Sequence, residues 1–488
     1  MKAIVIGREE YRDKVFACWL GKNIGGTFGA PHECKRYALG LEFYDPMPKR
    51  AAANDDLDLQ LVWLQMLEEQ GTDPALPYFG EYWSRYAASY PWNEYGFFMR
   101  NWTRGLRPPV AGCFENYFVD EMGSPIRSEI WGCLHAGDPQ AAARLAWKDS
   151  AVDHAGGEGM WGEMFWSALQ AAAFVESDPK TLIRIGLGMI PLSSHVGRAI
   201  REAVWCHENG KSWGDARERI VSRFAGLQPC NAAPNHGFTI LGWLYGKDFG
   251  DRLCKAVNCG YDTDCTGATL GATLGIIGGT RGIPERWKKP VGTGIVLHQF
   301  TRGLRAPKNI QELTRRTVKL AEEAAKGNTE RTFGKKTVKP PDYLGRLFRN
   351  ERAEAARQQD IHAATALSRG TEVTLHYGGE PVLRPGIAKE VRVTVAGKEN
   401  PTVELAAPKG WKCEEMGGGR FRLTSRGPIA DRNRMRVVLG KGRGVEFTML
   451  GPGEAKGFAA GDNVEKCPVC WARVEACICA GKKRRGRK

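Results

Sequence analysis

The sequence predicts a mainly α-helical domain followed by a small β-sandwich and a short cysteine-rich tail. Across the first two thirds of the 488 residues, apolar side chains recur at helical spacing and strand patterns are almost absent. Beyond that point, short runs with a period of two, separated by Gly and Pro, replace the helical pattern. A chain of this length also exceeds one simple core. We therefore expect a helical domain over 1–326, a basic connector over 327–368, an immunoglobulin-like β-sandwich over 369–452 and a cysteine-rich basic tail over 461–488.

The helical domain begins with a predicted helix over 11–30, in which Tyr11, Val15 and Trp19 recur at helical spacing. A second helix is predicted over 57–69, where leucines supply an apolar face. The remaining predicted helices cover 139–148, 160–176, 181–190, 196–208, 264–278 and 308–325. The last of these is charged and amphipathic, and we expect it to close the domain because the polar, basic stretch that follows is typical of a linker.

Alternating apolar and polar residues predict the strands of the β-sandwich. Over 372–377, for example, every second side chain is apolar, as in a strand with one buried face. The predicted strands cover 372–377, 391–395, 420–423, 435–439 and 445–449. The short runs and the Gly and Pro between them favour two packed antiparallel sheets.

The net charge of +15 is concentrated in two segments. Residues 301–360 carry +7 and residues 482–488 carry +6, which leaves +2 for the rest of the chain. A basic tail attracts polyanions only weakly, so nucleic acid is a weak candidate partner. No apolar run reaches the ~18 residues that span a bilayer, and the beginning of the chain lacks the apolar core of a signal peptide. We therefore expect a cytoplasmic protein with no membrane partner.

Two acidic clusters stand at the starts of predicted helices. Residues 54–56 (Asn-Asp-Asp) precede the helix over 57–69, and residues 262–264 (Asp-Thr-Asp) open the helix over 264–278. Asn and Asp are common N-cap residues, so capping and metal binding explain the first cluster about equally well. Clustered carboxylates repel one another, which favours a cation between them. Their oxygens suit a hard divalent cation.

The helix over 264–278 is dense in Gly, Ala and Thr. Each glycine weakens an isolated helix by roughly 1 kcal/mol relative to Ala, so these residues need a packing reason. Small side chains allow the backbone of another helix to approach closely. We expect such an approach to bring the two acidic clusters together.

Three segments in this order resemble the signature of the ADP-ribosylglycohydrolases, of the type that activates dinitrogenase reductase. They are the glycine-rich stretch 25–33, the cluster 54–56 and the segment 260–264 (Gly-Tyr-Asp-Thr-Asp). The resemblance spans roughly residues 10–326. It implies an all-α fold with a centre of two Mg²⁺ ions, or of Mn²⁺ in some members, at the base of a cleft that binds ADP-ribose.

The resemblance also implies roles for individual residues. The metal-binding aspartates of the family correspond to Asp55, Asp56, Asp262 and Asp264. Asn54, before the first aspartate pair, and Cys265, after the second, are further candidate metal ligands. The family usually has Thr at the first of these positions and a hydroxyl residue at the second. Glu33 matches the glutamate that ends the first motif, and either Glu33 or Asp56 is a candidate base for the attacking water. Candidate substrate-binding residues are Gly123, Ser124, His154 and Tyr261.

Together these features predict metal-dependent hydrolysis of an N- or O-glycosidic bond. Four carboxylates carry enough negative charge to hold two divalent cations, which acidify water and grip a ribose diol. Nearby negative charge also stabilises the oxocarbenium-like transition state. The expected substrate is an ADP-ribosylated protein or a small ADP-ribosyl or ribosyl compound. Two alternatives remain: a non-catalytic or structural homologue that binds ADP-ribose, and a nucleic-acid-associated module acting through the basic tail.

Four of the 14 cysteines lie in the tail, namely Cys467, Cys470, Cys477 and Cys479. A Cys-x2-Cys pair is a zinc half-site, although Cys-x-Cys is an unusual partner for it. We therefore predict a small structural Zn²⁺ site in the tail, with free thiols as the alternative. The other cysteines lack the spacing of a disulfide framework and are expected to be reduced.

Overall fold

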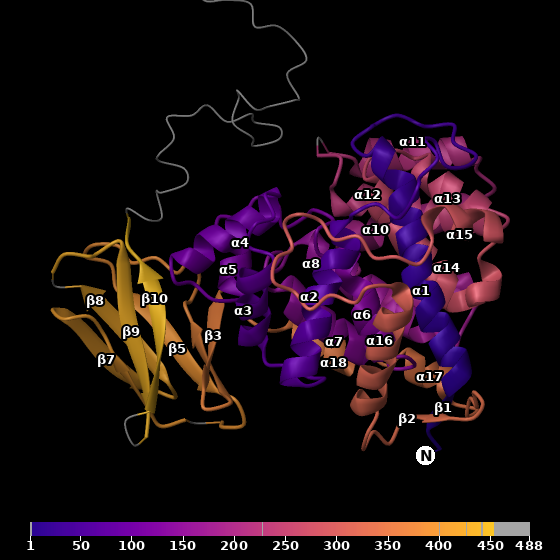
Figure 1. The fold of residues 1–488 in the computed structure, drawn as a ribbon. Coiled ribbons are helices and arrows are strands. Elements are labelled where there is room, and N and C mark those ends of the chain that lie inside the picture. The colour runs from indigo at the N-terminus through magenta and orange to yellow at the C-terminus, as the bar shows by residue number, and fades with distance from the viewer. Residues whose placement is uncertain (1, 227, 400, 426, 441–442, 453–488) are drawn as a thin grey trace, which may run out of the picture.

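The computed structural model confirms a mainly helical domain followed by antiparallel sheets (Figure 1). It describes residues 2–226, 228–399, 401–425, 427–440 and 443–452. The tail cysteines predicted to bind zinc, and the basic end of the chain, lie outside these residues. Within the described part of the chain, no helix combines the length and the apolarity that crossing a bilayer requires.

Every helix that periodicity predicts is present, with its ends shifted by at most a few residues. The longer helices are α1 (Arg8–Gly29), α2 (Asp55–Gln70), α3 (Leu76–Tyr86), α4 (Asn93–Thr103), α7 (Pro139–Ser150), α8 (Glu158–Ala173), α9 (Pro179–Gly188), α10 (His195–Glu208), α11 (Trp213–Phe224), α12 (Ala232–Tyr245), α13 (Phe249–Val257), α14 (Thr263–Gly278) and α16 (Ile310–Ala324). The short helices are α5 (Val110–Cys113), α6 (Ser128–Leu134), α15 (Glu285–Val291), α17 (Tyr343–Leu347) and α18 (Glu351–Arg357), with 3₁₀ turns η1 (Ala30–His32), η2 (Pro125–Arg127) and η3 (Thr280–Gly282). Periodicity did not predict α3, α4, α11, α12 or α13. Of these, α12 is buried along almost its whole length, so no polar face marks it as a helix.

The close packing of α1 against α14 is the central contact of the helical domain. The helices run antiparallel, so that Gly21 faces Gly271 and Gly25 faces Gly267. A Cβ on any of these four glycines would collide with a backbone carbonyl group of the other helix. The close approach predicted for the glycine-rich helix is therefore confirmed, and its partner is the helix that carries the first glycine-rich motif.

This packing places the end of α1 beside the start of α14. The Thr263 hydroxyl donates to the Gly29 carbonyl oxygen at 2.8 Å, where the row of glycines ends. Glu33 follows α1 after the single turn of η1, and Asp262 immediately precedes α14. Residues that are far apart in the sequence therefore meet at one end of the helix pair.

Two short strands tie the beginning of the chain to the segment after α16. β1 (Ile4–Gly7) pairs in parallel with β2 (Arg331–Gly334). Arg331 is buried, and its guanidinium donates to the Leu134 carbonyl oxygen at 3.1 Å. The stretch expected as a connector contains β2, α17, α18 and the strand β3 (Ala363–Ser368), and α18 packs on α7.

The C-terminal region forms two antiparallel sheets, with strand orders β3-β4-β5-β8-β7 and β10-β9-β6. The remaining strands are β4 (Thr371–His376), β5 (Lys389–Val395), β6 (Val403–Ala406), β7 (Trp411–Gly417), β8 (Arg420–Ser425), β9 (Arg432–Leu439) and β10 (Arg443–Leu450). Alternate residues are buried, as Val391 and Val393 are on β5 and Met435 and Val437 are on β9. Each sheet thus has one apolar face, which is the arrangement that the alternating sequence predicts.

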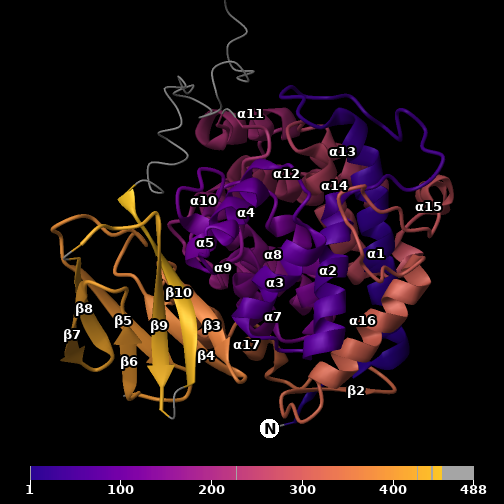
Figure 2. The same ribbon diagram turned by 60° about the vertical axis from the view of Figure 1, so that its left-hand side comes forward.

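The sheets contact the helical domain through α3, α5 and the loop between α4 and α5. The Thr365 N–H donates to the Pro108 carbonyl oxygen at 3.0 Å, and the Glu372 carboxylate accepts from the Leu76 N–H at 2.9 Å. Both views place the sheets beside these helices and away from α14 (Figures 1 and 2).

Gly271→Ala is expected to destabilise the protein, because its Cβ would meet the carbonyl oxygen of Gly21, which belongs to the rigid backbone of α1. Overpacking of this kind costs about 1–3 kcal/mol, occasionally more. Gly278→Ala in the same helix is the matched control: the space around it is open, and Ala favours a helix over Gly by up to ~1 kcal/mol. Urea unfolding of both variants checks this, and equal stabilities would contradict the close approach.

Candidate metal centre

An acidic cavity of about 380 Å³ lies where α1 and α14 meet. Its walls come from the segment after α1, the starts of α2, α4 and α14, and the loops before η2 and α12. The carboxylates that line it belong to Glu33, Asp55, Glu94, Glu121, Asp262 and Asp264. No Lys or Arg is among the described residues that line this cavity.

Backbone hydrogen bonds hold the two sides of the cavity in register. The Cys34 N–H donates to the Tyr261 carbonyl oxygen at 2.8 Å, and the Tyr261 N–H donates to the Lys35 carbonyl oxygen at 2.7 Å. Tyr261 has a positive φ of 68°, which lets the chain turn sharply into α14. Asp262 occupies the N-cap position of α14, but its carboxylate makes no capping hydrogen bond. Capping therefore does not explain this aspartate.

Three carboxylates converge on one point of the cavity wall. One oxygen each from Glu33, Asp262 and Asp264 lies within 4.8 Å of the other two. Asp262 Oδ1 and Asp264 Oδ1 are buried and accept no hydrogen bond from any described residue. A buried oxygen without a partner is costly, and a hard divalent cation satisfies such oxygens. These residues fit a Mg²⁺ or Mn²⁺ ion.

A second group on the other side of Asp264 is less suited to a hard cation. Asp56, Asp264 and Cys265 offer ligand atoms within 4.8 Å of one another. The Cys265 thiol donates to Asp56 Oδ2 at 3.7 Å, and a thiol is a poor ligand for Mg²⁺. The Asn54 side-chain oxygen accepts from the Asp56 N–H at 2.7 Å, so it caps α2.

Lys22, on α1, is a buried cation directly behind this second group. Its Nζ lies 3.4 Å from Asp56 Oδ1 and 3.0 Å from Glu129 Oε2, and all three side chains are fully buried. Burial alone would lower the pKa of Lys22, but the charges of Glu129 and Asp56 outweigh it and raise that pKa. Lys22 therefore stays charged. The signal in the sequence was a lysine amid the small and apolar residues of α1, and sequence reasoning missed it.

Desolvation and mutual repulsion raise the pKa values of the cavity carboxylates. Although Glu33 is exposed as a residue, its carboxylate faces the cavity, where desolvation and the neighbouring Cys34 and Asp55 raise its pKa to about 7. Burial, followed by the charges of Glu33 and Asp56, raises the pKa of Asp264 to about 8. Without a cation, these groups hold protons near neutral pH.

Asp55 and Asp58, both in the first turn of α2, face different directions. Asp55 lines the cavity, and its Oδ2 accepts from the indole N–H of Trp92 at 3.1 Å. Asp58 faces away: its Oδ2 accepts from the Tyr90 hydroxyl at 3.2 Å and from the His298 N–H at 2.5 Å. Asp58 thus anchors the loop between α15 and α16 and does not belong to the cavity.

Of the four candidate substrate-binding residues, only Gly123 lines the cavity. Ser124 is fully buried, and its Oγ bonds the Ser150 hydroxyl at 2.8 Å. His154 is also fully buried, with Nδ1 2.7 Å from Asp153 Oδ1. The Tyr261 side chain is buried against Phe238 rather than in the cavity wall.

A buried arginine supports the Gly123 wall. Arg127 donates to the Gly123 carbonyl oxygen at 2.8 Å and forms a bidentate pair with Asp153, with both distances 2.9 Å. The Tyr95 hydroxyl donates to the same carbonyl oxygen at 3.0 Å. Ser124 and His154 belong to the polar network around Arg127, so their contacts support the wall from behind.

Sequence reasoning did not single out two further carboxylates of the cavity, those of Glu94 and Glu121. Burial raises the pKa of both glutamates. Trp92 is 43% exposed at the cavity, beside Asp55. The one local indication was Pro91 before the aromatic and acidic start of α4. This pattern is also common in helices that have no binding or catalytic site.

Comparison with known proteins identifies the family. A family model described as ADP-ribosylglycohydrolase matches residues 7–326. The chain belongs to the ADP-ribosylglycohydrolase family. A solved structure described as an ADP-ribosylglycohydrolase-related protein complex is 18% identical in sequence; the match covers 65% of this chain and 99% of that chain, with a TM-score of 0.43. No curated protein matches the chain.

Family membership confirms the resemblance read from the three motifs. ADP-ribosylglycohydrolases are metal-dependent hydrolases of the glycosidase type that act on ADP-ribosylated substrates. The family match gives no support to a nucleic-acid ligand. The metal dependence of the family is compatible with the carboxylates that line the cavity.

Lys22→Met is expected to destabilise the protein strongly, because it leaves Asp56 and Glu129 buried without a counter-charge. Removing one member of a buried ion pair costs about 3–5 kcal/mol. Lys180→Met, which breaks an exposed pair with Glu208, should cost less than ~1 kcal/mol. Chemical denaturation of both variants measures the difference, and similar losses would show that Lys22 is not a buried counter-ion.

The cation-free protein is expected to lose stability as the pH rises from about 5 to about 8. The pKa values of Glu33 and Asp264 are higher in the folded protein than their ordinary values of 4.5 and 3.8. The folded state therefore binds more protons than the unfolded state in this window, and stability falls with rising pH. Thermal unfolding in EDTA at several pH values measures how steeply the stability falls with rising pH. Mn²⁺ should reduce it, and so should Glu33→Gln; a slope unchanged by either would contradict the assignment.

Proposed function

We propose that the protein hydrolyses an N- or O-glycosidic bond in an ADP-ribosylated or related ribosyl substrate, with Mg²⁺ or Mn²⁺ held in the acidic cavity. The observation that carries the proposal is the convergence of Glu33, Asp262 and Asp264, with buried oxygens that no described residue satisfies. The cavity walls supply no basic side chain among the described lining residues. Cations are therefore the natural counter-charge for these carboxylates.

Two cation positions follow from the carboxylate groups, and we infer that they differ in strength. The first is held by Glu33, Asp262 and Asp264, which offer only oxygen ligands. The second would use Asp56, Asp264 and Cys265, where Lys22 already neutralises Asp56. When bound, a divalent cation acidifies a water molecule and orients a ribose diol. We expect the first position to bind more tightly.

Glu33 is better placed than Asp56 to act as the base. Its carboxylate faces the cavity, and only one of its two oxygens is needed for the first cation position, which leaves the other to accept a proton from the attacking water. Asp56 is buried, and both of its oxygens have neighbours: Lys22 at 3.4 Å and the Cys265 thiol at 3.7 Å. The remaining carboxylates are close enough to the cavity to stabilise positive charge that develops on the sugar ring.

The opposite wall of the cavity offers a surface for the rest of the substrate. Trp92 is partly exposed, and its indole is held by the hydrogen bond to Asp55. A fixed aromatic ring stacks well on a planar base. Gly123 faces Glu94 and Tyr95 so closely that a Cβ would collide with both side chains. A side chain at position 123 would therefore displace Glu94 or Tyr95 from the cavity wall.

A cation-dependent binder of ADP-ribose without turnover is the second candidate. The observation that favours it is the weakness of the second cation position, where Lys22 and Cys265 occupy the oxygens of Asp56. If two cations are needed for hydrolysis, a protein that holds only one would bind ADP-ribose and not release it from a modified target. Release of free ADP-ribose separates the two candidates.

Asp264→Asn is expected to abolish high-affinity Mn²⁺ binding, because Asp264 is shared by both cation positions. Calorimetric titration with Mn²⁺ measures this, and release of ADP-ribose from ADP-ribosylated protein measures turnover, which should also be lost. Asp58→Asn is the matched control, since Asp58 stands in the same acidic stretch but faces the loop after α15; its Mn²⁺ affinity should stay as in the unmodified protein. Equal affinities for both variants would refute the metal assignment.

A further inference from the structure

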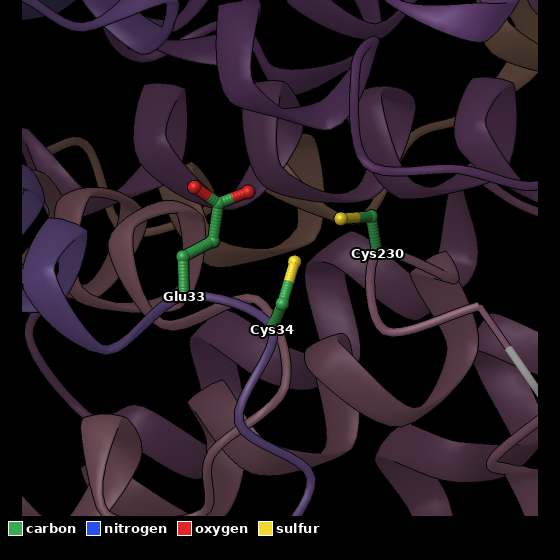
Figure 3. A group of neighbouring side chains, drawn as sticks. All are labelled: Glu33, Cys34 and Cys230. Atoms are coloured by element: carbon green, nitrogen blue, oxygen red, sulfur yellow. The ribbon is translucent and has the colours of Figure 1, made fainter. Parts of the chain in front are cut away.

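Two cysteines and a glutamate form a separate group at the cavity. Figure 3 shows the side chains of Glu33, Cys34 and Cys230 directed toward a common region. One carboxylate oxygen and the two sulfur atoms all lie within 4.8 Å of one another. All three residues line the cavity. The group therefore opens on the space where the proposed hydrolytic reaction takes place.

The backbone holds both cysteines in place from opposite sides. Cys34 follows η1, and its N–H donates to the Tyr261 carbonyl oxygen at 2.8 Å, with the residue at a positive φ of 66°. Cys230 immediately precedes the N-cap of α12, and its carbonyl oxygen accepts from the Met122 N–H at 2.9 Å. These backbone contacts hold the two sulfur atoms within 4.8 Å of each other.

The other close pair of cysteines in the described residues lacks these properties. Cys18 and Cys133 lie with their sulfur atoms 3.9 Å apart, but both side chains are fully buried in the core of the helical domain. Neither belongs to a group with a carboxylate ligand, and neither lines the cavity. The chemistry of Cys34 and Cys230 is therefore not that of ordinary core thiols.

We propose that Glu33, Cys34 and Cys230 form a binding site for Zn²⁺. Two thiolates and one carboxylate are ligands that Zn²⁺ accepts in proteins, whereas Mg²⁺ avoids sulfur. Three protein ligands leave a fourth tetrahedral position, and here that position faces the cavity. Binding forms two metal–sulfur bonds and one metal–oxygen bond and releases to water the two thiol protons, together with the proton of Glu33 where that carboxyl group is protonated. The site is distinct from the all-oxygen group, with which it shares only Glu33.

The shared glutamate couples the two sites. A Glu33 carboxylate that gives one oxygen to Zn²⁺ has only one oxygen left, so it cannot both complete the all-oxygen position and accept a proton from water. Zn²⁺ at this site should therefore inhibit the hydrolysis. This consequence rests on the proposed function, whereas the binding of Zn²⁺ does not.

Titration of the full-length, reduced protein with Co²⁺, used as a coloured substitute for Zn²⁺, tests the proposal. The unmodified protein should develop the near-ultraviolet absorption of thiolate-to-cobalt charge transfer, and added Zn²⁺ should displace it. Cys34→Ser and Cys230→Ser should each lose one equivalent of this absorption relative to the unmodified chain. Cys413→Ser, a partly buried cysteine on β7, is the matched control and should lose none. The tail cysteines contribute equally to every variant, so they do not affect the difference.

Two further measurements keep the test decisive if a serine variant folds poorly. In the unmodified chain, Zn²⁺ should protect Cys34 and Cys230 from alkylation, detected by mass spectrometry, while Cys413 reacts at an unchanged rate. Asp264→Asn should keep the charge-transfer absorption even though it loses Mn²⁺ binding, so failure of the hydrolase proposal is distinguishable from failure of this one. Unchanged absorption in both serine variants, alkylation unaffected by Zn²⁺, or a Cys34–Cys230 disulfide that persists in the reduced sample would each overturn the zinc site.

Discussion

The backbone contact between α1 and α14 is the constraint on which the rest of the structure depends. Four glycines, two on each helix, let the helices approach until carbonyl groups fill the places where side chains would lie. The contact places the end of α1 beside the start of α14, and the acidic residues lie at these two points. The glycines weaken each helix considered alone. Their benefit lies in the tertiary structure, because no side chain separates the segment after α1 from the segment before α14.

Gathering so many carboxylates has an electrostatic cost, which the protein meets in two ways. Behind the cavity, Lys22 supplies one fixed positive charge between Asp56 and Glu129. Inside the cavity no described lining residue supplies another, so burial and the neighbouring negative charges raise the pKa values of Glu33 and Asp264. The repulsion between these carboxylates therefore favours the binding of either protons or cations. Such repulsion at the expense of stability is common where function requires buried charge.

Local patterns in the sequence predicted eight of the longer helices, five of the strands in the two sheets and the meeting of the two acidic clusters. Each of these features has a signal within a few neighbouring residues. Periodic apolar positions mark the helices and strands, and Asp262 and Asp264 at a helix start mark one acidic cluster. The pairing of β1 with β2 was missed because both strands are short and lie at opposite ends of the helical domain. Lys22 and Cys230 were missed for a related reason: their roles arise from neighbours that are distant in the sequence. Ser124 and His154 were drawn from family resemblance, which identifies a segment but does not tell whether a side chain faces the cavity or lies behind it.

The proposed hydrolytic site requires a cation between the ends of α1 and α14. The most direct measurement is the anomalous diffraction of crystals soaked in Mn²⁺. We expect a peak in the anomalous difference map between the carboxylates of Glu33, Asp262 and Asp264. A map with no peak at these residues, at Mn²⁺ concentrations that saturate binding in solution, would contradict the proposed site.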